Sequence, residues 1–566
     1  MGDMKTARTL HPLTKALLER RGIADIAEQE RFLYPDYERD TYDPFRILNM
    51  ERAVDRILLA MANGERIVIY GDYDCDGIPG SVILHDLLKK IGYRNFLNYI
   101  PHRHTEGYGL NTAAVEQFGT DGVKLLVTVD CGITDVEEVA LAQKLGIDVI
   151  ITDHHLPPFD HAEGKQGALP PAYAVINSKQ KGDSYPDPML CGAGVAFKLA
   201  KALIVRGNFS QIGEGWEKWL LDMAGLSTIA DMVPLKNENR VLAYYGLKVL
   251  RRSPRPGLQA LLREAGVDQR YLSEEDVGFT IGPRINAASR MDVPLRAFEL
   301  LSTEDPFIGG ERAKHLAGLN GERKLTVARM MKEAKKVLRE RTIREVIVVG
   351  SPSWRVGVVG IVANQLAEEY DRPVFVWGRE GTREIKGSCR SDGRVNLVEL
   401  MVAVRDGIFI DRGGHEFSGG FSVSHEHIHL LEDALVEAHG CLPKKEVKTE
   451  KIASDAELML DEVNEETFHA IDLLAPFGEG NPKPHFLFRG VRIEFVAPFG
   501  KEKNHLKLIF KNSGGSRIEA IGFFLAPSDF PGADVRNGGT IDLVATFEKS
   551  YFRGRPELRL RIIDIT

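Results

Sequence analysis

The sequence has few cysteines and no long hydrophobic run, and these two absences narrow the kind of protein that it encodes. Five cysteines are scattered over the 566 residues, at positions 75, 131, 191, 389 and 441, and no two form a Cys-x-x-Cys pair. This pattern argues against a disulfide framework and a structural zinc site. No stretch approaches the ~18 consecutive apolar residues of a membrane-spanning helix, and the opening residues lack a signal-peptide pattern. We therefore expect a cytoplasmic protein with reduced thiols and no membrane partner.

The sequence also lacks an excess of basic over acidic residues, since the formal net charge is −8. Proteins that bind nucleic acid usually present a basic patch, so the overall charge does not point to that class. Net charge hides local clusters, however, and a group of metal-binding aspartates would make the bare chain look more acidic than the loaded protein. At roughly 100–200 residues per domain, the length predicts three or four domains.

Residues 66–177 alternate short apolar runs with helical patterns. The apolar runs lie at 66–70, 96–100, 125–129, 148–152 and 172–176, and helices are expected at 81–91, 110–118 and 135–145. Nearly continuous apolar strands that alternate with helices are typical of a parallel sheet that is covered on both faces.

Polar side chains follow each of these expected strands. In chain order they are GDYDCDG (71–77), PHRH (101–104), DCG (130–132), DHH (153–155) and Asn177. In an open parallel sheet, ligands bind outside the carboxyl ends of the strands. Ordinary solvated loops would carry residues such as Lys, Ser and Glu there, and repeated Asp and His instead indicate a site.

The aspartates indicate a cation site. Asp72, Asp74 and Asp76 alternate along the chain after the first strand, and three close carboxylates are costly unless a cation neutralises them. A solvated turn remains an alternative, whereas an EF-hand lacks its twelfth-position Glu. Asp130 and His154 arrive from two other strand ends. Oxygen-rich sites with one or two imidazoles suit Mn²⁺ or Mg²⁺, and two such ions are the usual arrangement for phosphodiester hydrolysis.

The rest of the chain has three different patterns. Helical periodicity at 193–250 and 311–341 predicts helices, the second a long one between two lobes whose methionines, Met330 and Met331, pack in the core. A second α/β unit begins at residue 345 and includes the glycine-dense GGHEFSGGF at 413–421. From residue 451 onward, alternating apolar residues predict short antiparallel strands in a barrel or sandwich.

The motifs together resemble a known family. DHH at 153–155 lies between acidic motifs, as in the DHH phosphoesterase superfamily. Further motifs narrow the resemblance to the RecJ exonucleases over nearly the whole chain: IPHRHTEGYGL (100–110), LCGAGVAFKL (190–199), TIADMVPLKNENR (228–240), IGPRINAASRM (281–291), GSCRS (387–391), GGHEFSGGF and APFGEGNPKP (475–484).

This resemblance implies an α/β fold, in which a parallel-sheet DHH domain is joined by a long helix to a second α/β domain, DHHA1, followed by a C-terminal β-barrel OB-fold. The implied segments are an N-terminal segment (1–48), the DHH domain (49–240), a helical connector (241–341), the DHHA1 domain (342–446) and the OB-fold (447–566). The implied activity is 5′-to-3′ hydrolysis of single-stranded DNA with two Mn²⁺ or Mg²⁺ ions, in DNA repair and recombination. A helicase and a single-strand-binding protein are open as partners, and a monomer is favoured.

The resemblance also assigns roles to residues. It makes Asp74, Asp76, Asp130, His154 and Asp231 metal ligands, with Asp72 a ligand or a support. It gives catalytic positions to Asp130, Asp153 and His155, with Asp130 bridging both ions and His155 contacting the scissile phosphate. It gives strand binding to eight residues: Arg103, Arg284, Arg290, Ser388, Arg390, Gly413, Gly414 and His415.

Alternatives remain open at this point. His155 could be structural, Arg284 and Arg290 could form interdomain salt bridges, and GGHEFSGG could be a tight backbone passage. Arg355, Ser289, Glu416 and Pro79 depart from the family pattern and affect only the details of substrate contact. Two other functions compete with the exonuclease. One is a small-substrate phosphoesterase, against which the extra barrel argues, and the other is a DNA-binding scaffold without ions, against which the intact acidic motifs argue.

Overall fold

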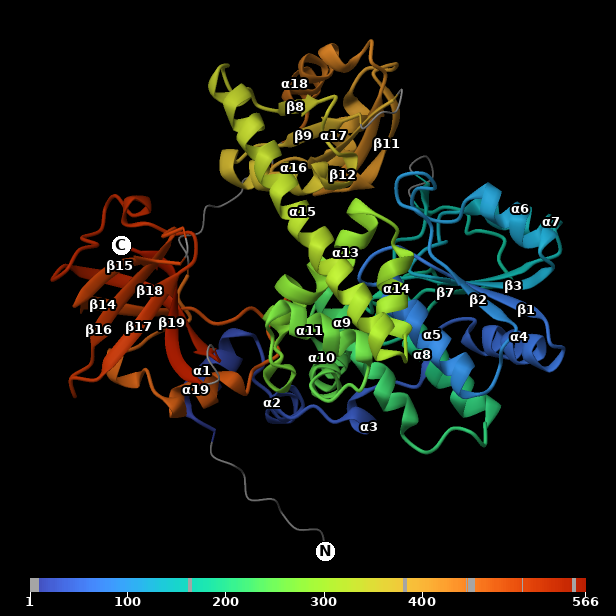
Figure 1. Cartoon of the computed structure of the whole chain (residues 1–566), viewed down its shortest axis with the longest axis horizontal. Coiled ribbons are helices and arrows are strands. Elements are labelled where there is room, and N and C mark those ends of the chain that lie inside the picture. Colours follow the sequence, from blue (N-terminus) through green and yellow to red (C-terminus); the bar gives the residue numbers. More distant parts are fainter. Residues whose placement is uncertain are drawn as a thin grey trace, which may run out of the picture.

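The computed structural model describes residues 10–160, 165–379, 384–443, 445, 453–500, 502–551 and 556–566. The chain folds into three lobes (Figure 1), and the long helix α15 (Pro306–Arg339) runs from the first lobe to the second. The expected boundary at 446/447 and the first nine residues lie outside the described part. None of the helices within the described ranges combines the length and apolar composition needed to cross a membrane.

The first lobe contains the expected parallel sheet, in the order β2-β1-β3-β4-β7. Its strands lie where the apolar runs predict them: β1 (Arg66–Gly71), β2 (Phe96–Tyr99), β3 (Val123–Val129), β4 (Asp148–Thr152) and β7 (Ala174–Ile176). A short hairpin of β5 (Phe159–Asp160) and β6 (Lys165–Gln166) lies outside this sheet.

Helices cover both faces of this sheet, which confirms the expectation. Ile67 and Ile69 face one core with helices α4 (Met50–Ala62), α5 (Gly77–Lys90) and α8 (Gly192–Gly207). The alternate residues Val68 and Tyr70 face a second core with helices α6 (Thr112–Thr120) and α7 (Val136–Lys144). Strands β1, β3, β4 and β7 therefore bury both of their faces, as their continuous apolar sequences require, whereas the edge strand β2 is half-buried.

Short helices connect this sheet to α15: η2 (Trp216–Leu220), α9 (Leu221–Ala230), α10 (Asn237–Leu250), α11 (Pro256–Ala265), η3 (Gln269–Tyr271), α12 (Glu274–Asp276), η4 (Val277–Ile281), α13 (Gly282–Met291) and α14 (Leu295–Ser302). Helix α15 begins five residues before the expected start, because Asp305 caps it by accepting a hydrogen bond from the Phe307 amide and Pro306 occupies its first position. Met330 is buried and Met331 is half-buried, so both pack as expected.

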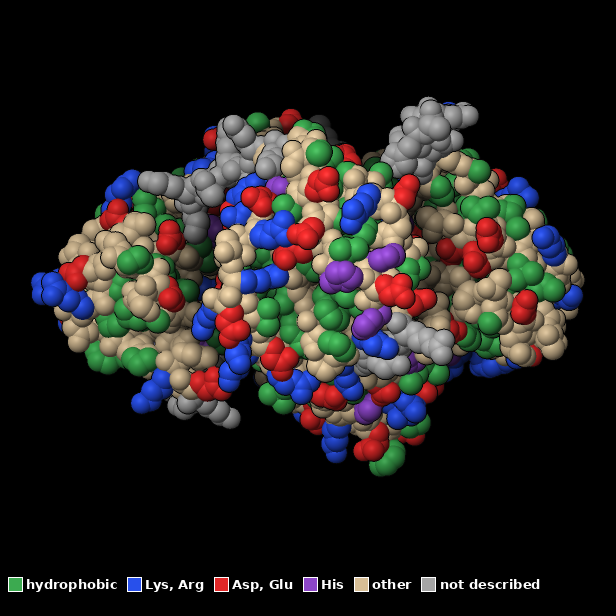
Figure 2. All heavy atoms as spheres, turned by 90° about the horizontal axis from the view of Figure 1, so that it is seen from above, with side chains coloured by type: hydrophobic (Ala, Val, Ile, Leu, Met, Phe, Trp, Pro, Cys, Tyr) green, Lys and Arg blue, Asp and Glu red, His purple; other side chains and the backbone are tan. Residues whose placement is uncertain are grey.

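The second lobe is a mixed sheet in the order β11-β12-β10-β9-β8. Its elements are β8 (Ile347–Ser351), α16 (Val356–Tyr370), β9 (Val374–Gly378), β10 (Ile385–Arg390), α17 (Leu397–Ala403), β11 (Phe409–His415), β12 (Ser418–Val423), η5 (Ile428–Leu430) and α18 (Leu431–Cys441). Helices α15 and α16 share one core with the sheet, and α17 and α18 share another. Basic and acidic side chains are interspersed on the face seen from above (Figure 2), in keeping with the modest net charge.

The third lobe is a seven-stranded sheet in the order β13-β14-β18-β19-β17-β16-β15. Its elements are β13 (Ala456–Glu457), η6 (Leu460–Glu462), α19 (Glu465–Asp472), β14 (Phe486–Arg492), β15 (Phe495–Phe499), β16 (His505–Lys511), β17 (Arg517–Gly522), η7 (Pro527–Asp529), β18 (Thr540–Ser550) and β19 (Glu557–Ile565). Strands β14 and β16 contact each other although they are not neighbours in the sheet. The sheet is therefore curled around its core, and the described strands β13 and β15 do not pair to close it.

The N-terminal segment joins the first and third lobes. Leu17 and Leu18 of helix α1 (Pro12–Arg20) lie in the core of the third lobe with helix α2 (Ile26–Leu33), whereas Tyr37 of α3 (Tyr37–Asp40) lies in the core of the first. The short helix η1 (Pro44–Arg46) follows. Arg240 of α10 adds a buried connection, because its guanidinium donates to the carbonyls of Phe32 and Ala475. The third lobe is thus anchored directly to the helices of the first.

Candidate metal centre

The acidic loop between β1 and α5 is held by hydrogen bonds to its own aspartates. The Asp74 carboxylate accepts from the amides of Asp76 and Gly77, at 2.7 and 3.2 Å, and thereby starts helix α5. The Asp76 carboxylate accepts from the amides of Gly192 and Ala193 at the N-terminus of α8, at 2.6 and 2.7 Å. These amides and the helix dipole stabilise the negative charge of Asp76 at a fixed position.

Asp130 lies at the end of β3 in a left-handed backbone conformation, with φ of 63°. Its amide donates to the Thr152 carbonyl on β4 at 2.9 Å, which turns the side chain toward the acidic loop. Helix α8 approaches so closely that a Cβ on Gly192 would lie 2.5 Å from the Cβ of Asp130. Only glycine fits there, and its absent side chain lets Asp76 and Asp130 share one small space.

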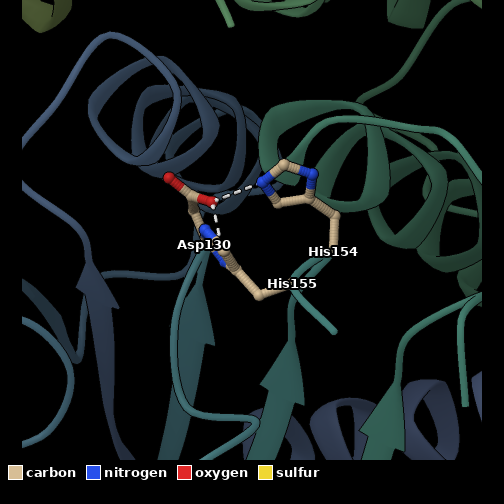
Figure 3. Close-up of side chains that lie close together, drawn as sticks. All are labelled: Asp130, His154 and His155. Carbon is tan, nitrogen blue, oxygen red and sulfur yellow. Dashed lines mark ion pairs between the residues drawn. The ribbon is translucent and has the colours of Figure 1, made fainter. Parts of the chain in front are cut away.

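His154 brings the remaining carboxylates together. Its Nε2 lies 3.2 Å from Asp130 Oδ1, 3.6 Å from Asp76 Oδ2 and 3.8 Å from Oδ2 of Asp231, which caps the C-terminal end of α9. Figure 3 shows His154 and His155 converging on Asp130 from the neighbouring strand end.

Three groups of side chains offer ligand atoms within 4.8 Å of one another: Asp130 with His154 and His155, Asp76 with His154 and Asp231, and Asp72 with Asp74 and Asp130. Asp130 belongs to two of these groups, and so does His154. All six residues predicted as metal ligands are therefore adjacent.

The polar atoms of this site fit a divalent cation. Asp72 Oδ1 and Asp130 Oδ1 are buried and accept no hydrogen bond from the described residues. Burial lowers the pKa of His154, against the attraction of Asp76, so the neutral ring can direct an Nε2 lone pair at three carboxylates. Lone pairs that face one another in a buried space need a cation or a proton between them.

The carboxylates also repel one another strongly in the absence of an ion. Burial, with the charges of Asp76 and Asp74, raises the pKa of Asp231 to about 9. Burial and neighbouring carboxylates raise the pKa values of Asp72 and Asp130 well above their usual range. Such shifts are typical of sites in which like charges are gathered for a function.

Asp153 lies under the metal cluster and supports His155. It is fully buried, and its Oδ1 accepts from His155 Nδ1 at 2.8 Å while its Oδ2 accepts from the Ile133 amide at 3.0 Å. Although burial alone would raise the pKa of Asp153, the hydrogen bond from His155 lowers it. Asp153 is thus an ionised support, and the Nε2 of His155 is left for another partner.

The second lobe contributes Ser388 and Arg390 from strand β10. Ser388 Oγ and Arg390 Nη2 each lie 3.4 Å from the place that a Cβ on Gly360 would occupy, so both side chains lie over helix α16. Arg103 of the first lobe packs its guanidinium 4.8 Å from the ring centre of Tyr73. The charge of Arg103 contributes to the lowered pKa of Arg390, after burial, which indicates that the two lobes bring these cations close together.

Arg290 lies among other arginines. Burial and the nearby charges of Arg103, Arg323 and Arg390 lower the pKa of Arg290 to about 9. Its Nη1 donates to the Gly357 carbonyl of the second lobe at 3.2 Å, so it is an interlobe contact but not a salt bridge. None of these four arginines forms a salt bridge with a carboxylate of the described residues, and such a cluster of guanidinium groups is suited to phosphate.

Arg284 is further along α13. Its Nη1 donates to the Thr280 carbonyl at 2.7 Å, and its Nε is buried and has no partner among the described atoms. Its charge lowers the pKa of Lys324 and of Arg323 on α15, after burial. Arg284 forms no salt bridge within the described ranges, and it extends the cationic surface away from Arg290.

The glycine motif forms the end of the β11–β12 hairpin. Gly413, Gly414 and His415 are exposed there. Gly414 has φ of 143°, and a Cβ on it would lie 2.4 Å from the Ser418 carbonyl oxygen, so the tight backbone passage requires glycine. Burial and the charge of His155 both lower the pKa of His415, which indicates that the hairpin faces the metal centre of the first lobe.

Comparison with known proteins agrees with this geometry. Sequence models of three domain families match the chain: the DHH family N-terminal domain at 66–228, the DHHA1 domain at 344–440 and the RecJ OB domain at 454–564. The single-stranded-DNA-specific exonuclease RecJ of Haemophilus influenzae is 32% identical over 568 residues, which cover 98% of this chain and 96% of that protein. The chain belongs to the RecJ family.

Other RecJ proteins extend the comparison. RecJ of Bacillus subtilis is 39% identical over 517 residues, which cover 90% of this chain and 63% of that longer protein. The crystal structure of Thermus thermophilus RecJ in complex with Mn²⁺ matches with a TM-score of 0.79 and 26% identity, over 98% of this chain and 76% of that one. The curled third sheet is accordingly an OB-fold.

The departures from the RecJ pattern have structural partners. Arg355 pairs with Glu322 on α15 at 2.9 Å, and Glu416 pairs with Lys445. Ser289 is buried in α13 and donates to the Asn286 carbonyl at 3.1 Å. Pro79 lies in the first turn of α5, where a missing amide is tolerated. None of these four residues belongs to the metal groups.

Sequence reasoning missed several neighbours of the site. Tyr108 lies with its hydroxyl 3.2 Å from the Asp130 carbonyl oxygen and 3.0 Å from His155 Nδ1. Lys179 follows β7, and the charge of Asp231 acts on its pKa against the lowering effect of burial. Asn286 accepts the Cys75 amide at 2.8 Å and so ties α13 to the acidic loop. Tyr108 and Lys179 both follow strand ends, which is the criterion that found the aspartates.

Proposed function

We propose that this chain is a metal-dependent exonuclease that hydrolyses single-stranded DNA from its 5′ end and acts in DNA repair and recombination. The observation that carries this proposal is the set of three overlapping ligand groups, which share Asp130 and His154 at one sheet edge. The relatives named single-stranded-DNA-specific exonucleases match over nearly the full chain, which supports the same substrate class.

Two Mn²⁺ or Mg²⁺ ions would be held by Asp74, Asp76, Asp130, His154 and Asp231, with Asp130 between them and Asp72 as a sixth ligand or a support. When bound, such ions activate a water and stabilise the charge that develops on the phosphate. RecJ of Thermus thermophilus has been crystallised with Mn²⁺ and with Mg²⁺, which supports this choice of metal. The buried oxygens of Asp72 and Asp130 are the structural reason for expecting the ions here.

His155 would hold the scissile phosphate. The Asp153 carboxylate raises the pKa of His155 against the effect of burial, so the ring tends to keep both protons. Its Nδ1 hydrogen is directed at Asp153, and its Nε2 hydrogen is then available to a phosphate oxygen. Asp153 acts through His155, and we regard it as a positioning residue.

The direction of digestion would come from the cationic groups of both lobes. Arg103, Ser388 and Arg390 would bind the 5′-terminal phosphate, with His415 and the amides near Gly413 and Gly414 on the opposite side of the strand. Arg290 and Arg284 would contact the nucleotides that follow. The OB-fold at 447–566 would hold the more distant strand, as OB-folds do by stacking bases on aromatic side chains. The DHH domain at 49–240, the connector at 241–341 and the DHHA1 domain at 342–446 would form the catalytic part, with the segment 1–48 as its link to the OB-fold.

The same proposal includes the protein partners of the enzyme and the cellular compartment in which it acts. A helicase or a single-strand-binding protein would supply accessible single strands to such an enzyme. All five cysteines are free in the structure, which supports a reducing compartment such as the cytoplasm.

Release of nucleotides from a 5′-labelled single strand tests the function. We expect release that requires added Mn²⁺ and that is abolished in Asp130→Ala, with the fold retained. A small-substrate phosphoesterase would cleave dinucleotides but not long strands, and a scaffold would bind strands without cleaving them. Hydrolysis by Asp130→Ala at the wild-type rate would contradict the assignment of the site.

A further inference from the structure

A cavity of about 600 Å³ opens on the first lobe, away from the metal centre. It is lined by the last turn of α5, the loop after it, η2, the start of α11 and the turn after α14. None of the residues assigned to DNA or to metal lines it. A volume of this size is suited to a small ligand, since such sites are typically about 300–1,000 Å³.

The cavity lies at the far ends of the two helices that carry metal ligands. Helix α5 begins directly after Asp76 and ends at the cavity, with Lys90 on the rim. Helix α9 runs from Asp222 in the cavity to its cap Asp231 in the metal centre. The two helices pack against each other. At about 1.5 Å per residue, the 14 residues of α5 separate the two places by roughly 20 Å.

The floor of the cavity is a buried ion-pair network. Arg255 Nη1 lies 2.7 Å from Asp86 Oδ2, and Arg255 Nε lies 2.7 Å from Asp222 Oδ2. Ser253 also donates to Asp222, at 2.8 Å. The two carboxylates share one guanidinium, so the floor is rigid and keeps one net negative charge on side chains beneath the opening.

The rim carries cations that no carboxylate neutralises. Lys89 pairs with Glu304 at 2.9 Å, which accounts for the remaining acidic residue of the lining. Lys90 and Arg94 form no ion pair within the described part of the chain. Arg94 donates only to the carbonyls of Lys89 and Tyr93, and both cations are exposed. The lining as a whole has four cations and three carboxylates, so the two unpaired cations at the opening leave a net positive charge that favours an anionic ligand.

Two of the four tryptophans of the chain line the same cavity. Trp216 is half-buried, with the Lys90 ammonium 6.0 Å from its ring centre, and Trp219 is 49% exposed. Adjacent exposed apolar surface often marks the binding site of a ligand or partner. Indole faces stack well on flat aromatic groups such as nucleobases.

We propose that this cavity binds a nucleoside 5′-monophosphate, with the base against Trp216 and Trp219 and the phosphate on Lys90 and Arg94. The choice of ligand rests in part on the proposed function, because an exonuclease releases this class of compound. An acidic peptide would satisfy the cations, but it would leave two indole faces without a flat partner. Since Asp76 and Asp231 lie at the other ends of the same helices, a product that binds here lies on elements that reach the metal centre.

Isothermal titration calorimetry with deoxyadenosine monophosphate tests the proposal on the full chain. Titrations in Mn²⁺ and in EDTA separate the cavity from the metal centre, because binding in the cavity persists in EDTA. We expect the double variant Lys90→Met/Arg94→Met to weaken binding at least about tenfold, and Trp219→Ala to weaken it about fivefold or more. Lys314→Met, an exposed lysine on α15, is the matched control and binds as the wild type does.

Titrations with other ligands test whether both the base and the phosphate contribute to binding. Deoxyadenosine and inorganic phosphate should each bind much more weakly than the nucleotide. Equal binding of inorganic phosphate, wild-type affinity in both cavity variants, or binding of an oligo-aspartate peptide without binding of the nucleotide would overturn the proposal. Binding in EDTA does not depend on hydrolysis. A chain that digests DNA but binds no nucleotide in EDTA would refute this inference alone.

Discussion

The buried carboxylate of Asp153 and the imidazole of His155 form a pair in which Asp153 Oδ1 accepts from His155 Nδ1 at 2.8 Å. The same oxygen also accepts the amides of His154 and His155, at 2.7 and 3.0 Å. A side chain that receives three donors from the next two residues fixes the backbone of both histidines and the imidazole of His155. The DHH sequence is therefore a local device in which one residue orients the two that follow it.

Asp153→Asn should keep the metal site and lower the rate of cleavage. The amide retains an acceptor oxygen but offers the imidazole no negative charge, so the pKa of His155 should fall. Partners that hydrogen-bond to histidines of metal sites typically contribute about 10–100-fold to metal affinity or activity. Initial rates with Mn²⁺ and calorimetric Mn²⁺ affinity would be measured together. A variant that loses the metal as well would show that Asp153 has a wider structural role.

Substitutions of the two histidines should have different effects in the same two assays. His154→Ala should lose metal affinity, because Nε2 of His154 lies within 3.8 Å of three carboxylate oxygens. His155→Ala should bind metal nearly as the wild type does but cleave slowly, because its role is at the phosphate. Equal loss of metal in both variants would contradict this division.

Much of this centre could be predicted from the sequence. Apolar runs that precede Asp or His predict the five strands and five of the six candidate ligands, because a buried parallel strand must be apolar and its carboxyl end is where a site forms. The sixth, Asp231, caps a helix and is assigned only by the family resemblance. Helix α5 begins at Gly77, four residues before the start that the sequence predicts, because the capping by Asp74 depends on a side-chain conformation. The hydrogen bond from Arg290 to the Gly357 carbonyl could not be predicted either, because every residue has a backbone carbonyl and the sequence does not distinguish this one. Helix α1 packs with the OB-fold although the two segments are more than 400 residues apart, and no local sequence pattern predicts this contact.

Removal of the metal should make the stability of the protein fall as the pH rises. In the metal-free protein the pKa of Asp231 is about 9, whereas an unfolded Asp has a pKa of about 3.9. Between these values the folded state keeps a proton that the unfolded state has released, so rising pH favours unfolding. Thermal melting in EDTA from pH 5 to pH 9 would be compared with Asp231→Asn, whose stability should depend less on pH. Added Mn²⁺ should raise the melting temperature more at pH 8 than at pH 5, and a metal-free protein that becomes more stable up to pH 9 would contradict the prediction.

Gly192→Ala should weaken metal binding although Gly192 is not a metal ligand. The new Cβ would lie 2.5 Å from the Cβ of Asp130, so either Asp130 or the α8 amides that bind Asp76 must move. We expect a loss of Mn²⁺ affinity and of activity. Gly310→Ala in α15 is the matched control, because nothing lies within 4 Å of its Cβ position and alanine favours a helix. Normal Mn²⁺ affinity in Gly192→Ala would show that α8 can shift without disturbing the carboxylates.

The last prediction concerns how the 5′ end is recognised. Arg390 lies beside Ser388 in the second lobe, with Arg103 approaching from the first, so a terminal phosphate would be held between lobes. Arg390→Ala should slow digestion of 5′-phosphorylated strands and hardly change that of 5′-hydroxyl strands, because only the former present the additional charge. The loss should correspond to about 1.5–3 kcal/mol, the usual contribution of a hydrogen bond to a charged group. Lys386→Ala, an exposed residue on the same strand, is the control and should leave both rates unchanged. If Arg390→Ala slows both substrates equally, Arg390 contacts the backbone generally, and the residues that read the 5′ end lie elsewhere.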